Sequence, residues 1–190
     1  MRTIAITAAA TLAAALAVGT ATLAARGIDA PPPAVRAAEA PDDATIVAIF
    51  DAANTADVET GALAAKQGST KEVRDFGSML VRDHTQVRQQ GRDLAKKLGV
   101  TPTPPKSDQA AKDHAAAMAR LRGLTGPAFD RAFLQHEAAF HKAVIDAVTS
   151  TLLPAIQNSE LKALVTKVAP AFEAHMMAAQ SLEKKLTVGN

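Results

Sequence analysis

Residues 71–98 read KEVRDFGSMLVRDHTQVRQQGRDLAKKL, and this segment decides the fold class. Its apolar and small residues recur in steps of three and four over about seven turns, which is the period of an α-helix with one buried face. Gly99 follows in the position where a glycine commonly ends a helix. The segment therefore predicts a long amphipathic helix, whose buried stripe consists of Val73, Phe76, Leu80, His84, Val87, Gly91, Leu94 and Leu98.

Helical spacing continues on both sides of this segment. It predicts further long helices over about 43–67, 127–153 and 158–186, and a shorter, alanine-rich helix over 107–121. Pro170 lies inside the last of these, where we expect a kink or a broken turn. Long helices joined by short connections predict an all-α fold, an antiparallel four-helix bundle with an extra short helix.

The composition supports this fold class and excludes several kinds of site. Hydrophobic residues make up 48% of the chain but aromatic residues only 3%, so alanine, the best helix former, carries much of the apolar share. The absence of cysteine excludes disulfides, thiolate catalysis and cysteine-ligated metals. The chain has 21 basic residues, and without Arg2 and Arg26 it has 19, which equals the number of acidic residues. No basic stripe is visible. We therefore expect no nucleic-acid partner.

The N-terminal region has the pattern of an export signal. Residues 1–25 hold one basic side chain, Arg2, followed by an apolar stretch with small residues near its end, and form a signal peptide or an uncleaved N-terminal anchor. Residues 26–42 are a linker rich in proline and alanine, and residues 43–188 form the helical domain. We therefore expect a periplasmic or secreted protein of the cell envelope, which contacts a membrane only through residues 1–25, if they are retained.

Several histidines lie on or beside the apolar stripes. His84 and His175 fall within stripes, His136 and His141 flank the phenylalanine stripe of their helix from opposite sides, and Glu59 borders the core of the first helix. If Glu59, His84, His175 and one of the other two lie at one level, they supply a carboxylate and three imidazoles. That set suits a divalent transition metal such as zinc, iron, manganese or copper.

A structural interpretation of these residues stays open. A lone histidine on an apolar face is commonly a hydrogen-bonded core residue, because an unpaired polar group is costly to bury. Asp83, next to His84, and His136 are less favoured as ligands. The long helices contain no Glu-x-x-His motif, so a diiron centre of the ferroxidase kind is not expected.

Two stretches resemble a known family. Residues 56–64, ADVETGALA, and 73–85, VRDFGSMLVRDHT, are similar to an uncharacterised family of exported bacterial proteins, often labelled "predicted outer membrane protein". The resemblance extends over about residues 45–186 and implies a domain of unknown function with a ferritin-like bundle. It also implies that the recurring polar core positions are Glu59, His84, His141 and His175, which favours His141 over His136.

Two interpretations of the function follow. In the first, the protein binds a metal through Glu59, His84, His141 and His175. In the second, it is a non-enzymatic structural or stress protein of the envelope, which acts by binding a protein partner or a second copy of itself, and the histidines are structural. A redox activity at a bound metal is a third, weaker interpretation. No catalytic triad, phosphate-binding loop or dinucleotide fingerprint is visible, so a non-enzymatic role is preferred.

Overall fold

The computed structural model describes residues 40–107 and 109–188, and within these ranges the regular structure is entirely helical. The all-α class is therefore confirmed. The expected signal peptide or anchor and residues 26–39 of the linker lie outside the described residues. The elements are α1 (Asp43–Gln67), α2 (Lys71–Leu98), α3 (Gln109–Arg122), α4 (Gly126–Ala147), the π-helical turn η1 (Val148–Leu152), α5 (Leu153–Ala155) and α6 (Ser159–Val188).

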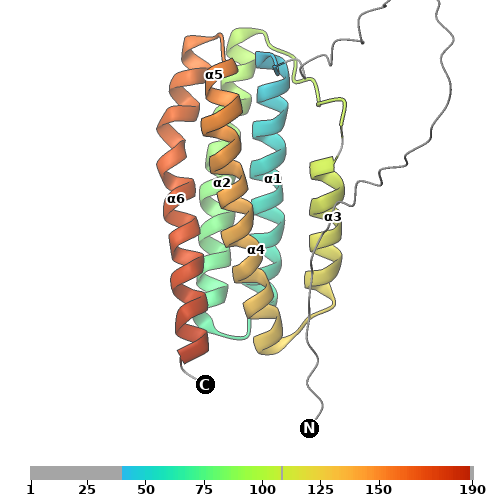
Figure 1. Ribbon diagram of the computed structural model, residues 1–190, viewed down its shortest axis with the longest axis vertical. Helices are drawn as coiled ribbons and strands as arrows, with labels where there is room; N and C mark the ends of the chain where they lie inside the picture. The colour runs from blue at the N-terminus through green and yellow to red at the C-terminus, as the bar shows by residue number, and fades with distance from the viewer. Residues whose placement is uncertain (1–39, 108, 189–190) are drawn as a thin grey trace, which may run out of the picture. The chain divides into compact units, whose positions relative to one another are not determined.

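The four long helices α1, α2, α4 and α6 lie side by side and form what we call the four-helix array (Figure 1). Helix α1 contacts α2 and α4, and α6 contacts the same two helices. Helices α1 and α6 run in one direction and α2 and α4 in the other, so each contacting pair is antiparallel (Figure 1). Helix α3 contacts α1 and α4 from outside the array.

Side chains at the helix starts bind the free backbone amides there. Asp42 Oδ1 accepts a hydrogen bond from the Thr45 amide at 2.8 Å, and Thr70 caps α2 in the same way. Asn158 Oδ1 accepts from the amides of residues 160 and 161 at the start of α6. Gly99 ends α2 with a φ of 66°, which glycine adopts without strain. These residues explain why the observed bounds of α1, α2 and α6 lie close to the predicted ones.

The two internal prolines break the helices less than the sequence predicts. Helix α6 continues through Pro170 without a broken turn. Both Pro170 and Thr166, whose carbonyl loses its helical partner, are exposed, so water can satisfy that carbonyl. The helix predicted to end before Pro154 instead passes through the π-helical turn η1 into α5, which contains Pro154. The missing amide and the ring of Pro154 disturb the α-helical hydrogen bonds of the turn before it, where η1 lies.

The core has two apolar ends separated by polar side chains. One apolar cluster includes Phe76, Phe133 and Ala179, and the other includes Ile46, Leu152 and Val165. On each long helix, buried polar residues lie between the positions that feed these clusters. We call this set the polar layer: Asn54, Asp57, Thr60, His84, Glu137, His141 and His175, each no more than 6% exposed.

Two glycines allow α1 and α2 to approach closely beside the polar layer. A Cβ on Gly61 would lie 2.8 Å from the Gly77 carbonyl oxygen, and a Cβ on Gly77 would lie 2.6 Å from that of Gly61. Both distances are shorter than real Cβ contacts, so these positions require glycine. None of the helices in the described part of the chain has a stretch long and apolar enough to cross a bilayer.

Candidate metal centre

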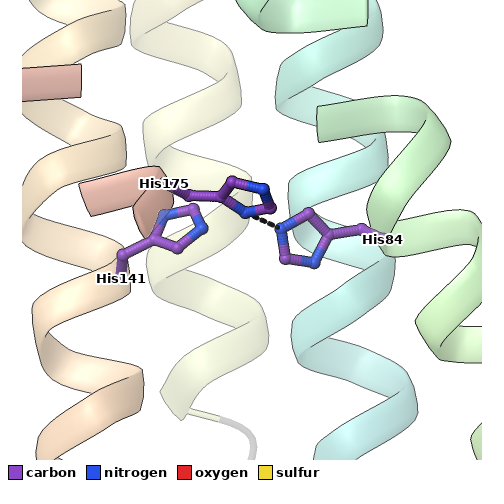
Figure 2. Close-up of side chains that lie close together, drawn as sticks. All are labelled: His84, His141 and His175. Carbon is purple, nitrogen blue, oxygen red and sulfur yellow. Dashed lines mark hydrogen bonds between the residues drawn. The ribbon is translucent and has the colours of Figure 1, made fainter. Parts of the chain in front are cut away.

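Three histidines from three helices meet in the polar layer. His84 of α2, His141 of α4 and His175 of α6 are buried, and their rings turn toward one another (Figure 2). One ring nitrogen from each lies within 4.8 Å of the other two. The closest pair is His84 Nε2 and His175 Nδ1, which are 3.1 Å apart. The sequence prediction of converging imidazoles therefore holds geometrically for these three.

The outer nitrogen of His84 is bound by an oxygen. Asn54 donates from Nδ2 to the Phe50 carbonyl oxygen at 2.8 Å, which fixes the orientation of its amide. Its Oδ1 consequently faces His84 Nδ1 at 2.9 Å and can only accept. The hydrogen-bond network thus assigns the proton of His84 to Nδ1 and leaves a lone pair on Nε2, which points to the interior of the group.

His141 is oriented in the same manner. Its Nδ1 donates to the backbone carbonyl oxygen of Glu137, one turn earlier on α4, at 2.9 Å. Its Nε2 therefore carries the lone pair. That atom is fully buried and has no hydrogen-bond partner among the described residues. A buried acceptor without a donor is destabilising unless something else binds it.

His175 completes the pattern. Its Nε2 lies 3.2 Å from Asp83 Oδ2, so the N–H at this nitrogen donates a hydrogen bond to the Asp83 carboxylate. The Nδ1 of a neutral His175 then presents a lone pair to the lone pair of His84 Nε2 at 3.1 Å. Two facing lone pairs repel each other unless a proton or a cation lies between them. Each of the three rings is thus held by an oxygen on its outer side and has an acceptor atom on its inner side.

Two buried carboxyl groups adjoin the histidines. Asp57 of α1 places Oδ2 3.3 Å from His84 Nδ1 and Oδ1 3.8 Å from His141 Nε2. Glu137 of α4 places Oε2 3.5 Å from His141 Nδ1. Asp57, Glu137 and His141 form a second group of potential ligand atoms within 4.8 Å of one another. None of the four carboxyl oxygens has a partner of hydrogen-bond geometry among the described residues.

Burial sets the protonation of this cluster. Together with the neighbouring imidazoles, it lowers the pKa of His84 to about 3 and that of His141 to about 4. Burial also raises the pKa of Glu137 to about 7, and burial followed by the charge of Glu137 raises the pKa of Asp57 well above its usual range. The metal-free cluster therefore contains neutral imidazoles, which are metal ligands without losing a proton.

The structure corrects the expected position of Glu59. Its side chain is half exposed and pairs with His114 of α3, with 2.8 Å between Oε2 and Nε2. Positions 57 and 59 are two residues apart on a helix and so point in nearly opposite directions. Because position 57 faces the core, Glu59 faces away from it, and Asp57 is the α1 carboxyl that lies beside the histidines.

The two less favoured candidates lie outside the histidine group. Asp83 orients His175 from its outer side and is a positioning residue there. His136 is half-buried and stacks on Phe140 with 5.9 Å between ring centroids. Burial and the nearby His114 and Arg120 lower the pKa of His136. Because His114 and Arg120 belong to α3, His136 lies on the side of α4 that faces α3. The choice of His141 over His136 is therefore supported by position.

Sequence reasoning overlooked Asp57 and Glu137, although the chain contains a signal for both. Glu137 is four residues after Phe133 and four before His141, so it lies on the same face as these buried residues. Asp57 precedes the buried Thr60 by three residues. Neither was predicted, because carboxyl groups are rarely assigned to a core and because the nearby Glu59 and His136 were considered instead.

Comparison with known proteins identifies one related family. The sequence model described as "Domain of unknown function (DUF4142)" matches residues 29–182, which include the whole polar layer. The comparisons with curated proteins and with solved structures yield no match.

Proposed function

The chain belongs to the DUF4142 family of domains of unknown function, and from the site described above we propose that it binds a divalent transition metal. The ligands are His84, His141 and His175, with Asp57 and Glu137 beside them. One observation carries the proposal: an oxygen acceptor holds the outer nitrogen of each ring, so three lone pairs face one another inside the core. Imidazoles that bind metals are characteristically held in this way.

The donor set fits such an ion in chemistry and in charge. Three neutral imidazoles are suitable ligands for zinc, iron, manganese or copper. Two ionised carboxyl groups would balance the charge of one divalent ion, so neither the ion nor the carboxylates would be left as an uncompensated buried charge. The same ion would provide a partner for the unpaired His141 Nε2, to which Asp57 Oδ1 lies within 3.8 Å. Glu59 has no part in this proposal.

The first test measures bound metal in protein purified without a histidine tag. We expect one ion per chain by elemental analysis, and a rise in melting temperature when the missing ion is restored to chelator-treated protein. His84→Ala and His175→Ala should lose the ion, whereas His136→Ala, which removes a half-buried histidine outside the group, should retain it. Protein without bound metal, whose melting is indifferent to zinc, iron, manganese and copper, would contradict the proposal and favour the structural interpretation.

A milder variant addresses the case in which the alanine variants do not fold. Asp83→Asn keeps all three imidazoles but weakens the contact that orients His175. Loss of such an outer contact typically lowers metal affinity by about 10–100-fold. We expect that loss in a competition titration with a chelating dye, with the helical circular dichroism unchanged.

We also propose that the protein is located in the cell envelope, as the N-terminal pattern supports. It should be recovered from the envelope fraction, and recovery from the cytoplasm would contradict that part of the proposal.

A further inference from the structure

A cavity of about 80 Å³ lies between α1, α4, η1 and α6. Its wall consists almost entirely of hydrocarbon side chains, among them Ile46, Ile49, Val144 and Val168. The lining includes only three residues with polar side chains: Asn54, Thr149 and Glu173. Of these, Thr149 and Glu173 are exposed to solvent, whereas Asn54 is buried.

Asn54 and Thr149 make their hydrogen bonds within the protein. Asn54 donates to the Phe50 carbonyl and accepts from His84. The Thr149 hydroxyl donates to the Ile145 carbonyl at 2.9 Å, within its own helix. A charged or strongly polar molecule entering this cavity would lose its hydration without replacement, which is costly. The lining therefore selects an uncharged, apolar molecule.

The cavity shares a wall with the histidine group. Phe172, which lines it, packs edge-on against His84, with 5.1 Å between ring centroids, and at a tilt against His141, with 5.7 Å between centroids. Asn54, also in the lining, holds His84 by the hydrogen bond already described. A molecule in the cavity is thus separated from the imidazoles by a single layer of side chains.

The backbone at one side of the cavity is unusual. Val148, Thr149 and Leu152 in its lining belong to η1, where the chain departs from α-helical geometry into a π-helical turn. Such turns are rare and occur frequently at functional sites. Pro154 follows this turn and is a local cause of its geometry, but an ordinary close-packed core has few voids larger than a water molecule, so the cavity beside the turn is unusual.

We propose that this cavity is a binding site for a small, uncharged, apolar molecule, the size of xenon or a short hydrocarbon. Apolar cavities of this kind stay free of water and accept such molecules, and a cavity of about 150 Å³ is known to accept benzene or xenon. The smaller volume here excludes a ring of the size of benzene. Binding in the cavity does not require the metal ion, but its relevance to chemistry at the histidine group rests on the metal proposal.

Xenon is the probe for the test. The full chain, labelled at its methyl groups, is followed by NMR under increasing xenon pressure. We expect saturable shifts of the Ile46, Val144 and Val168 methyl signals in both chelator-treated and metal-loaded protein. Ala53→Leu, which adds three carbon atoms to the lining, should abolish these shifts, and Ala62→Leu on the exposed side of α1 should retain them.

The outcomes distinguish the two proposals. Ala169→Leu fills the cavity from α6 and decides the question if Ala53→Leu does not fold. Absence of saturable shifts in the folded wild-type protein, or unchanged shifts in a folded cavity-filling variant, would overturn the cavity proposal. Xenon binding in protein that takes up no metal would leave the cavity site standing and would remove only the metal proposal.

Discussion

Glu137 shows what a single buried residue contributes in the absence of metal. Its carboxyl is fully buried, which raises its pKa to about 7. A group whose pKa is raised in the folded state stabilises the fold below its unfolded pKa, and this contribution is lost as the pH rises through the folded value. For Glu137 the loss occurs between its ordinary value of 4.5 and about 7.

A substitution isolates this contribution. Glu137→Gln is neutral at every pH, so in chelator-treated protein the wild type should lose stability relative to the variant between pH 5 and pH 8. We compare the unfolding free energies of the wild type and Glu137→Gln. A shift of the pKa from 4.5 to about 7 corresponds to a change on the order of 3 kcal/mol in the gap between these two free energies. Urea denaturation at the two pH values measures it, and Glu72→Gln at an exposed position is the control. An equal difference at both pH values would show that Glu137 does not titrate in this range.

The histidines could be predicted from the sequence, but the choice of carboxyl group on α1 could not, for a physical reason. An imidazole among apolar residues at helical spacing points inward whatever its rotamer, as His84 and His175 do. Which of two neighbouring positions on α1 faces the core depends on the rotation of the helix about its axis. The contact of Gly61 with Gly77 brings α1 against α2 with Asp57 inside. Tertiary packing sets that rotation. Periodicity alone therefore selected Glu59 in place of Asp57, which lies two residues earlier.

At the scale of elements, Asp130 of α4 joins the turn between α1 and α2. Its side chain is fully buried. Oδ1 accepts from the Ser69 amide at 2.8 Å, and Oδ2 accepts from the Ser69 hydroxyl at 2.6 Å and from the Thr70 amide at 3.1 Å. A negative group at the start of α2 also interacts favourably with the helix dipole. This side chain therefore fixes α4 against the first helical hairpin near one apolar end of the core.

Removing the side chain of Asp130 should be costly. Asp130→Ala leaves three donors without their acceptor, and we expect a loss of about 3 kcal/mol in unfolding free energy, measured by urea denaturation. Asp75→Ala is the matched control, because Asp75 pairs with Lys71 at the surface and such pairs contribute about 0–1 kcal/mol. Equal losses in the two variants would contradict the assigned role.

The elements themselves were largely predictable because their signals are local. Periodicity and the glycine after Leu98 specify α2, and the capping side chains of α1 and α6 adjoin the helices they begin. The π-helical turn was not predictable. Pro154 lies two residues after the turn, has no amide to donate and clashes with the carbonyl of Ser150, so the sequence does predict a break in the α-helical pattern here. It does not predict the form of that break, a π-helical turn through which the helical chain continues.

The histidine group lies in the polar layer of the four-helix array, between the two apolar clusters. The proposed ligands His84, His141 and His175 come from α2, α4 and α6, and Asp57 of α1 lies beside them, whereas α3 contributes none. An ion bound there connects residues far apart in the sequence, such as His84 and His175. It does so between the two apolar clusters, where neither cluster holds the helices together. Because an ion that binds only the folded state stabilises it by mass action, a concentration of 100 times its dissociation constant adds about 2.7 kcal/mol to the unfolding free energy.

Hydrogen exchange should reveal this connection. Opening any one of α2, α4 or α6 near the polar layer removes a ligand, so added metal should slow amide exchange in all three helices together. Helix α3 is attached through contacts such as that between His114 and Glu59, which the ion does not touch, so its exchange should be unchanged. His141→Ala should remove the effect from every helix at once, because the remaining ligands no longer surround the ion. Protection confined to one helix, or protection of α3 equal to that of α2, α4 and α6, would mean that the ion binds elsewhere. Only a centre shared by α2, α4 and α6 slows exchange in these helices together and leaves α3 unchanged.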